Sequence, residues 1–193
     1  MSVTTIRFVI TAAVAVILFM SRANADAQGA IIDWQGNGGY SARITMSYDA
    51  SLPLVFADGG YPFSTPTNYG ISSLSVQFFP PFSPPSSSTP LYSTQNVSNS
   101  IVTYKFLLLY FDTVSRNLTG ALDVGRDSFA EGDPGSSLGQ YHLLGLVSSP
   151  TLMNSFTAMP VDSGGTFTVT VVPEPSSIAL AGLGAALLFR RRK

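Results

Sequence analysis

The feature that most limits the possible folds is a strict alternation of apolar and polar residues in three separate segments. In residues 40–48, 73–78 and 166–171, every second residue is apolar and the residues between are Ser, Thr, Arg or Gln. A β-strand places successive side chains on opposite faces, so this period of two predicts strands with one face on a core and one in water. Half-buried strands of this kind are typical of antiparallel sheets.

Other apolar stretches extend this prediction. Residues 101–111 are apolar almost throughout, which predicts a central strand covered on both faces, with Lys105 as the exception. Residues 118–124 and 140–147 predict further strands. Glycine-containing turn sequences separate the segments, at residues 36–39, 58–60, 132–135 and 163–165. We therefore expect residues 26–171 to form one all-β domain, an antiparallel β-sandwich or a jelly roll.

Residues 80–90 hold five prolines and four serines, a composition that favours extended, unpaired backbone. We interpret this segment as a long surface loop; the alternative is a disordered linker between two half-domains. The chain has no cysteine, so an exported domain would be stabilised by its core or by a bound ion.

The charge of the body restricts its partners. The segment from Asp26 to Pro175 contains four bases and all eleven acids of the chain, a net charge of −7. Such a balance argues against nucleic acid or anionic lipid as a partner and accommodates a cationic ligand or a metal ion more easily.

Residues 1–25 have the pattern of a helical secretory signal peptide. Arg7 precedes the apolar run 8–20, and small residues follow up to Ala23 and Ala25, an A-x-A site for signal peptidase. Thirteen helical residues span roughly 20 Å, less than the ~30 Å hydrocarbon core of a membrane. A removable signal is thus favoured over a permanent anchor.

Residues 172–193 form a tail of a different kind. Val172 to Pro175 read Val-Pro-Glu-Pro, a short apolar stretch predicts a helix up to Phe189, and four bases end the sequence. The bases are expected to stay on the cytoplasmic side, which places the body outside.

This order resembles the PEP-CTERM sorting tail of bacterial envelope and exopolysaccharide-associated proteins. The resemblance implies a processing enzyme, an exosortase, that recognises Pro173, Glu174 and Pro175. It also implies a transient membrane anchor and a basic stop-transfer end. The anchor residues are Ile178, Leu180, Leu183, Leu187, Leu188 and Phe189, and the stop-transfer residues are Arg190, Arg191, Arg192 and Lys193. The alternative is an ordinary C-terminal anchor that is never processed. The body resembles, more loosely, the β-rich domains that precede such tails.

Candidate chemistry in the body is sparse. The one histidine, His142, lies in a predicted strand without a nucleophile motif around it, so a catalytic triad is disfavoured. The densest acidic group could bind calcium through loop oxygens, although solvated loop acids are the favoured interpretation; its members are Asp123, Asp127, Glu131 and Asp133. No other cofactor is expected, because structural zinc needs several Cys or His ligands.

Aromatic residues offer a second possibility. Trp34, Tyr61, Phe63 and the segment 78–82 could form a platform for sugars, but aromatics in a sandwich usually fill the core, and the alternation places Phe78 there. The sequence thus predicts an exported, non-enzymatic structural or adhesive protein of the cell surface or matrix. A carbohydrate-binding module attached to exopolysaccharide is the alternative, and a secreted glycan-acting hydrolase comes third.

Overall fold

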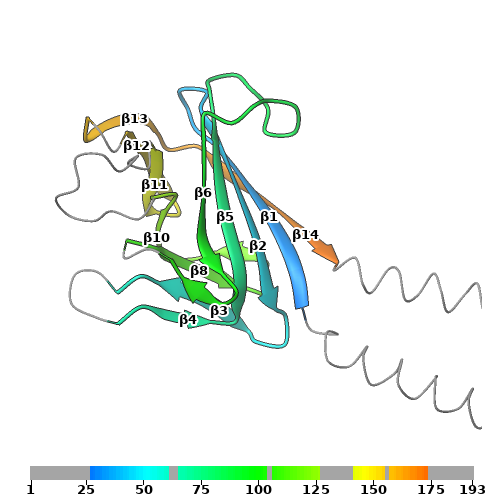
Figure 1. Ribbon diagram of the computed structural model, residues 1–193. Helices are drawn as coiled ribbons and strands as arrows, with labels where there is room; N and C mark the ends of the chain where they lie inside the picture. The colour runs from blue at the N-terminus through cyan, green and yellow to red at the C-terminus, as the bar shows by residue number, and fades with distance from the viewer. Residues whose placement is uncertain (1–26, 61–64, 104–105, 127–140, 155–156, 174–193) are drawn as a thin grey trace, which may run out of the picture. The chain divides into compact units, whose positions relative to one another are not determined.

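Two antiparallel β-sheets make up the computed structural model (Figure 1), which describes residues 27–60, 65–103, 106–126, 141–154 and 157–173. No helix occurs in these ranges, so the predicted all-β, sandwich-like class is confirmed. The predicted helical signal peptide and helical tail lie outside the described residues.

The strands divide into two sheets, A and B. In spatial order, sheet A consists of β14 (Thr166–Pro173), β1 (Ala27–Gln35), β2 (Ser41–Asp49), β5 (Ile71–Phe79), β6 (Tyr92–Ser98) and β7 (Ile101–Val102). Sheet B consists, in the same sense, of β13 (Met159–Ser163), β12 (Ser149–Asn154), β11 (Tyr141–Leu146), β10 (Ala121–Val124), β8 (Leu108–Asp112), β3 (Leu54–Asp58) and β4 (Thr67–Tyr69), with β9 (Asn117–Leu118) paired to β8. Residues Gln28–Val172 form one compact unit.

The core follows the alternation of the sequence. Ile44 and Met46 of β2 are buried, whereas Thr45 between them is exposed. β5 pairs with β2 over most of its length, with Val76 opposite Ile44 in the register. Because apolar side chains from both sheets belong to the same buried cluster, each sheet buries its apolar face against the other.

The apolar run 101–111 differs from its prediction as a single central strand. Residues 101–102 form β7 in sheet A, and residues 108–112 form β8 in sheet B, so the chain crosses between the sheets within this run. Ile101 is 68% exposed at the end of sheet A. In β8, Leu109 and Phe111 are buried while Leu108 and Tyr110 are partly exposed, so this strand is covered on one face more than the other.

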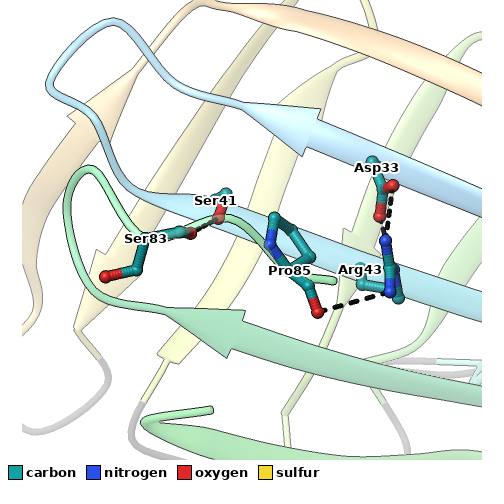
Figure 2. Close-up of polar contacts among 5 residues, drawn as sticks. All are labelled: Asp33, Ser41, Arg43, Ser83 and Pro85. Atoms are coloured by element: carbon teal, nitrogen blue, oxygen red, sulfur yellow. Dashed lines mark hydrogen bonds and ion pairs between the residues drawn. The ribbon is translucent and has the colours of Figure 1, made fainter. Parts of the chain in front are cut away.

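The proline-rich segment connects β5 to β6, which pair with each other in sheet A. It is held on β2 by polar contacts that Figure 2 shows. Arg43 forms a two-point ion pair with Asp33 of β1 at 2.7 and 2.9 Å, and its Nη1 donates to the carbonyl of Pro85 at 3.3 Å. Ser41 Oγ donates to the carbonyl of Ser83 at 3.2 Å. Side chains thus satisfy carbonyls that lack a strand partner.

Candidate functional site

The one histidine belongs to a polar cluster at the end of β10. Arg126 Nη2 lies 2.9 Å from His142 Nε2, and its guanidinium carbon lies 4.5 Å above the ring of Phe106. A guanidinium can only donate, so Nε2 accepts and the histidine proton is assigned to Nδ1. Asn96, which is buried, accepts from Gly125 N–H at 2.9 Å and donates to the carbonyl of Arg126 at 2.8 Å, fixing the backbone beneath this arginine.

Asp123 lies beside the same arginine in a poorer geometry. Its Oδ1 is 3.6 Å from Arg126 Nε, and neither atom has a hydrogen-bond partner among the described residues. Burial raises the pKa of Asp123 to about 7, against the opposing charge of Arg126. Burial and the same arginine lower the pKa of His142 to about 3. The histidine is therefore neutral at physiological pH and its Nε2 lone pair is occupied, which suits it poorly to act as a general base.

Of the four acidic residues considered for calcium binding, the structure describes only Asp123. Asp123 lies in β10, so it is a strand residue and not the solvated loop acid that the sequence favoured. Asp127, Glu131 and Asp133 lie outside the described residues. Among residues with a described placement, no group of three or more His, Cys, Asp or Glu side chains could hold a metal ion.

The predicted aromatic platform is not formed by the residues proposed for it. Trp34 is fully buried and donates from Nε1 to the carbonyl of Gly164 at 2.8 Å. Phe78 and Phe79 are buried as well, and Tyr61 and Phe63 lie outside the described residues. Of the platform residues that the structure describes, only Phe82, at 88% exposure, is available to a ligand.

A different aromatic row lies on sheet B. Phe56 of β3 is directly opposite Tyr69 of β4 and Tyr110 of β8 in the register. Its ring centroid is 5.7 Å from that of Tyr69 and 5.6 Å from that of Tyr110, and the ring planes are inclined by 28° and 29°. Val55 and Ala57, the neighbours of Phe56, are buried in the core, so the aromatic row lies on the opposite face of the sheet. Tyr69, on the edge strand, is 48% exposed.

Sequence reasoning missed this row because β3 reads Leu-Val-Phe-Ala-Asp, without the alternation that would separate its faces. It also missed Asp162, a buried carboxylate on β13. Its Oδ1 accepts from the N–H groups of Gly38 at 2.6 Å and Ser163 at 2.7 Å, and its Oδ2 accepts from Tyr40 N–H at 3.0 Å. This carboxylate therefore joins β13 to the turn between β1 and β2.

The sorting motif begins where the last strand ends. β14 runs to Pro173, the first residue of the Pro-Glu-Pro triplet, and Val172 before it is 39% exposed. A family model described as the PEP-CTERM protein-sorting motif matches residues 171–193. The chain carries a PEP-CTERM sorting motif. Neither curated proteins nor solved structures give a significant match to the chain.

The PEP-CTERM motif indicates that the protein is exported and sorted by an exosortase-type system. Of its residues, the structure describes only those up to Pro173; Glu174, Pro175, the predicted anchor and the stop-transfer residues lie beyond. The predicted signal-cleavage residues Ala23 and Ala25 also lie outside. The described residues form no helix that is long and apolar enough to cross a membrane.

Proposed function

We propose that this PEP-CTERM protein is a non-enzymatic structural or adhesive component of the cell surface or extracellular matrix, held by its tail until processing. The observation that carries the proposal is that each described acid and the histidine contact a partner within the protein. The lone pair of His142 is occupied by Arg126. Catalysis needs an acid, base or nucleophile whose reactive atom is free to meet a substrate.

Each acid in the described ranges has a local partner. Asp33 pairs with Arg43 and Asp123 with Arg126, while Asp162 accepts three backbone N–H groups. The other three accept from the turns beside them: Asp49 from Ser51, Asp58 from Gly60, and Asp112 from Val114 and Ser115. These contacts favour a scaffold over a pair of catalytic carboxylates.

The test uses protein that is produced as the full chain and recovered after export. A mass spectrum fixes both mature ends, and incubation with a panel of polysaccharides is expected to release no reducing ends. Turnover that a single substitution abolishes would contradict the proposal. The panel of variants includes Asp123→Asn, Asp127→Asn, Glu131→Gln and Asp133→Asn.

The second candidate function is carbohydrate binding, and the aromatic row favours it. The rings of Tyr69, Phe56 and Tyr110 follow one another across three strands, with Asp58 and Asp112 on the same face of β3 and β8. Stacking of apolar sugar faces on aromatic rings, with carboxylates that accept hydroxyl groups, is a suitable chemistry for polysaccharide.

Binding to a glycan array that Tyr69→Ala abolishes would support this second function. Phe82→Ala is the control, because it removes an aromatic side chain that is 88% exposed and lies outside the row. Trp34→Ala is unsuitable as a probe, since it removes a core side chain and would lower stability by about 3–5 kcal/mol. Absence of binding to any glycan would remove the candidate.

A further inference from the structure

In the part of the chain that the structure describes, the two sheets have four edges, and these are protected to different degrees. β7 and β4 are two and three residues long, and Asn68 Nδ2 donates across to the carbonyl of Ser100 at 2.7 Å. β13 is five residues long, contains Pro160 and carries a register shift in its pairing with β12. Short strands, prolines and bulges are the devices by which proteins keep an edge from pairing with another chain.

The fourth edge, β14, has none of these devices along its length. It is eight residues long, alternates Thr with Phe or Val, and contains no charged residue. Its only proline is Pro173 at the end. A long, uncharged strand rich in β-branched residues at the edge of a sheet is a template for strand pairing.

The side chains of β14 support the same conclusion independently. Phe167 and Val169 pack on the core but are only partly buried, whereas Ile44 and Met46 on the interior strand β2 are 0% and 1% exposed. The core is therefore incompletely covered along this edge. A further strand beside β14 would bury these side chains and complete the sheet.

We propose that β14 pairs antiparallel with β14 of a second copy of this chain, joining the two A sheets into one continuous sheet. Identical strands in a twofold antiparallel pair are self-complementary: the threonines of both copies share one face, and Phe167 and Val169 share the other with their counterparts. Such a pair closes as a dimer. The inference adds self-association to the proposed structural function. The dimer itself is argued from β14, and only its role in a surface or matrix protein rests on the proposed function.

The first experiment measures the mass of the exported, processed protein by sedimentation across a concentration series. A dimer that dissociates on dilution is expected. Thr168→Lys places a charge on the solvent face of the edge strand and is expected to weaken association roughly fivefold or more, because like charges meet across the pair. Thr45→Lys is the control, since Thr45 is also exposed on sheet A but lies on an interior strand.

The absence of cysteine permits a second test. Single cysteines at Thr166, Thr168 or Thr170 are expected to form intermolecular disulfides most readily at the position nearest the twofold axis, and Thr45→Cys is expected to form none. A monomer at every soluble concentration would overturn the inference. So would a dimer that Thr168→Lys leaves unchanged, or crosslinks that are equal at positions 45 and 168. The absence of hydrolytic activity is measured separately, so failure here leaves the proposed function intact.

Discussion

Asp162 and Asp123 are two largely buried aspartates of sheet B whose surroundings differ. Asp162 is 7% exposed and accepts three backbone N–H groups at 2.6–3.0 Å. Among the described residues, Asp123 has one charged neighbour at 3.6 Å, and its Oδ1 has no hydrogen-bond partner there. A buried carboxylate stabilises a fold only when its oxygens are satisfied. The difference indicates that Asp162 holds the sandwich together, whereas Asp123 contributes little at neutral pH.

The largest expected effect is the loss of stability on removing the Asp162 carboxylate. Asp162→Ala leaves three N–H groups without their acceptor and is expected to lower the free energy of unfolding by about 3 kcal/mol. Asp123→Ala, the matched control on the same sheet, is expected to change it by less than about 1 kcal/mol at pH 7. Urea denaturation followed by tryptophan fluorescence measures both. Equal losses at the two positions would contradict the comparison.

The second prediction tests the turn that receives Asp162. A Cβ at Gly36 would clash with Asp162 Oδ2 and lie 2.6 Å from the Trp34 ring, so Gly36→Ala is expected to destabilise the protein by about 2 kcal/mol. At Gly120 the backbone φ is +70° and no atom lies within 4 Å of an added Cβ. Gly120→Ala therefore measures backbone strain alone, about 1 kcal/mol. A loss at Gly36 no greater than at Gly120 would show that the turn can move away from the carboxylate.

The third prediction tests the comparison at Asp123 through the pH dependence of the free energy of unfolding. In the folded state its pKa rises from 3.8 to about 7, so its contribution to stability is present at low pH and is lost as the pH rises to about 7. The pKa of His142 falls from 6.5 to about 3, so its contribution is present above pH 6.5 and is lost as the pH falls. Between about pH 4 and pH 6.5 the two residues therefore change the free energy of unfolding in opposite directions as the pH rises.

Single substitutions should separate the two slopes. His142→Gln is expected to make the free energy of unfolding fall as the pH rises from about 4 to about 6, by at most about 1.4 kcal/mol per pH unit. Asp123→Asn is expected to give a slope of opposite sign in the same window. Thermal unfolding at fixed ionic strength measures them. Identical pH profiles for the two variants would refute the assignment.

The strands that could be predicted from the sequence are those with one buried face and one solvent-exposed face. β2, β5 and β14 alternate strictly, and all three were predicted, as was the burial of Phe78. The run 101–111 was assigned wrongly to one strand, because a continuous apolar segment does not show where the chain crosses between sheets.

Contacts between distant segments carried no local signal. Asp162 meets Gly38 across 124 residues of sequence, and nothing near either residue indicates the other. Phe56, Tyr69 and Tyr110 similarly become neighbours only through strand pairing. The sorting motif, by contrast, is contiguous, so the sequence alone was sufficient to find it.

β1 and β14 are the first and last described strands, yet they are neighbours in sheet A. A chain that is synthesised and exported from its N-terminus leaves β1 without this partner until residues 166–173 have arrived outside. Trp34 similarly lacks its hydrogen-bond acceptor until Gly164, 130 residues later in the sequence, has been exported. A chain that ends before these residues therefore leaves one edge of β1 unpaired and the Trp34 indole N–H without its acceptor. Sheet A is therefore complete only once the chain extends to the start of the sorting motif.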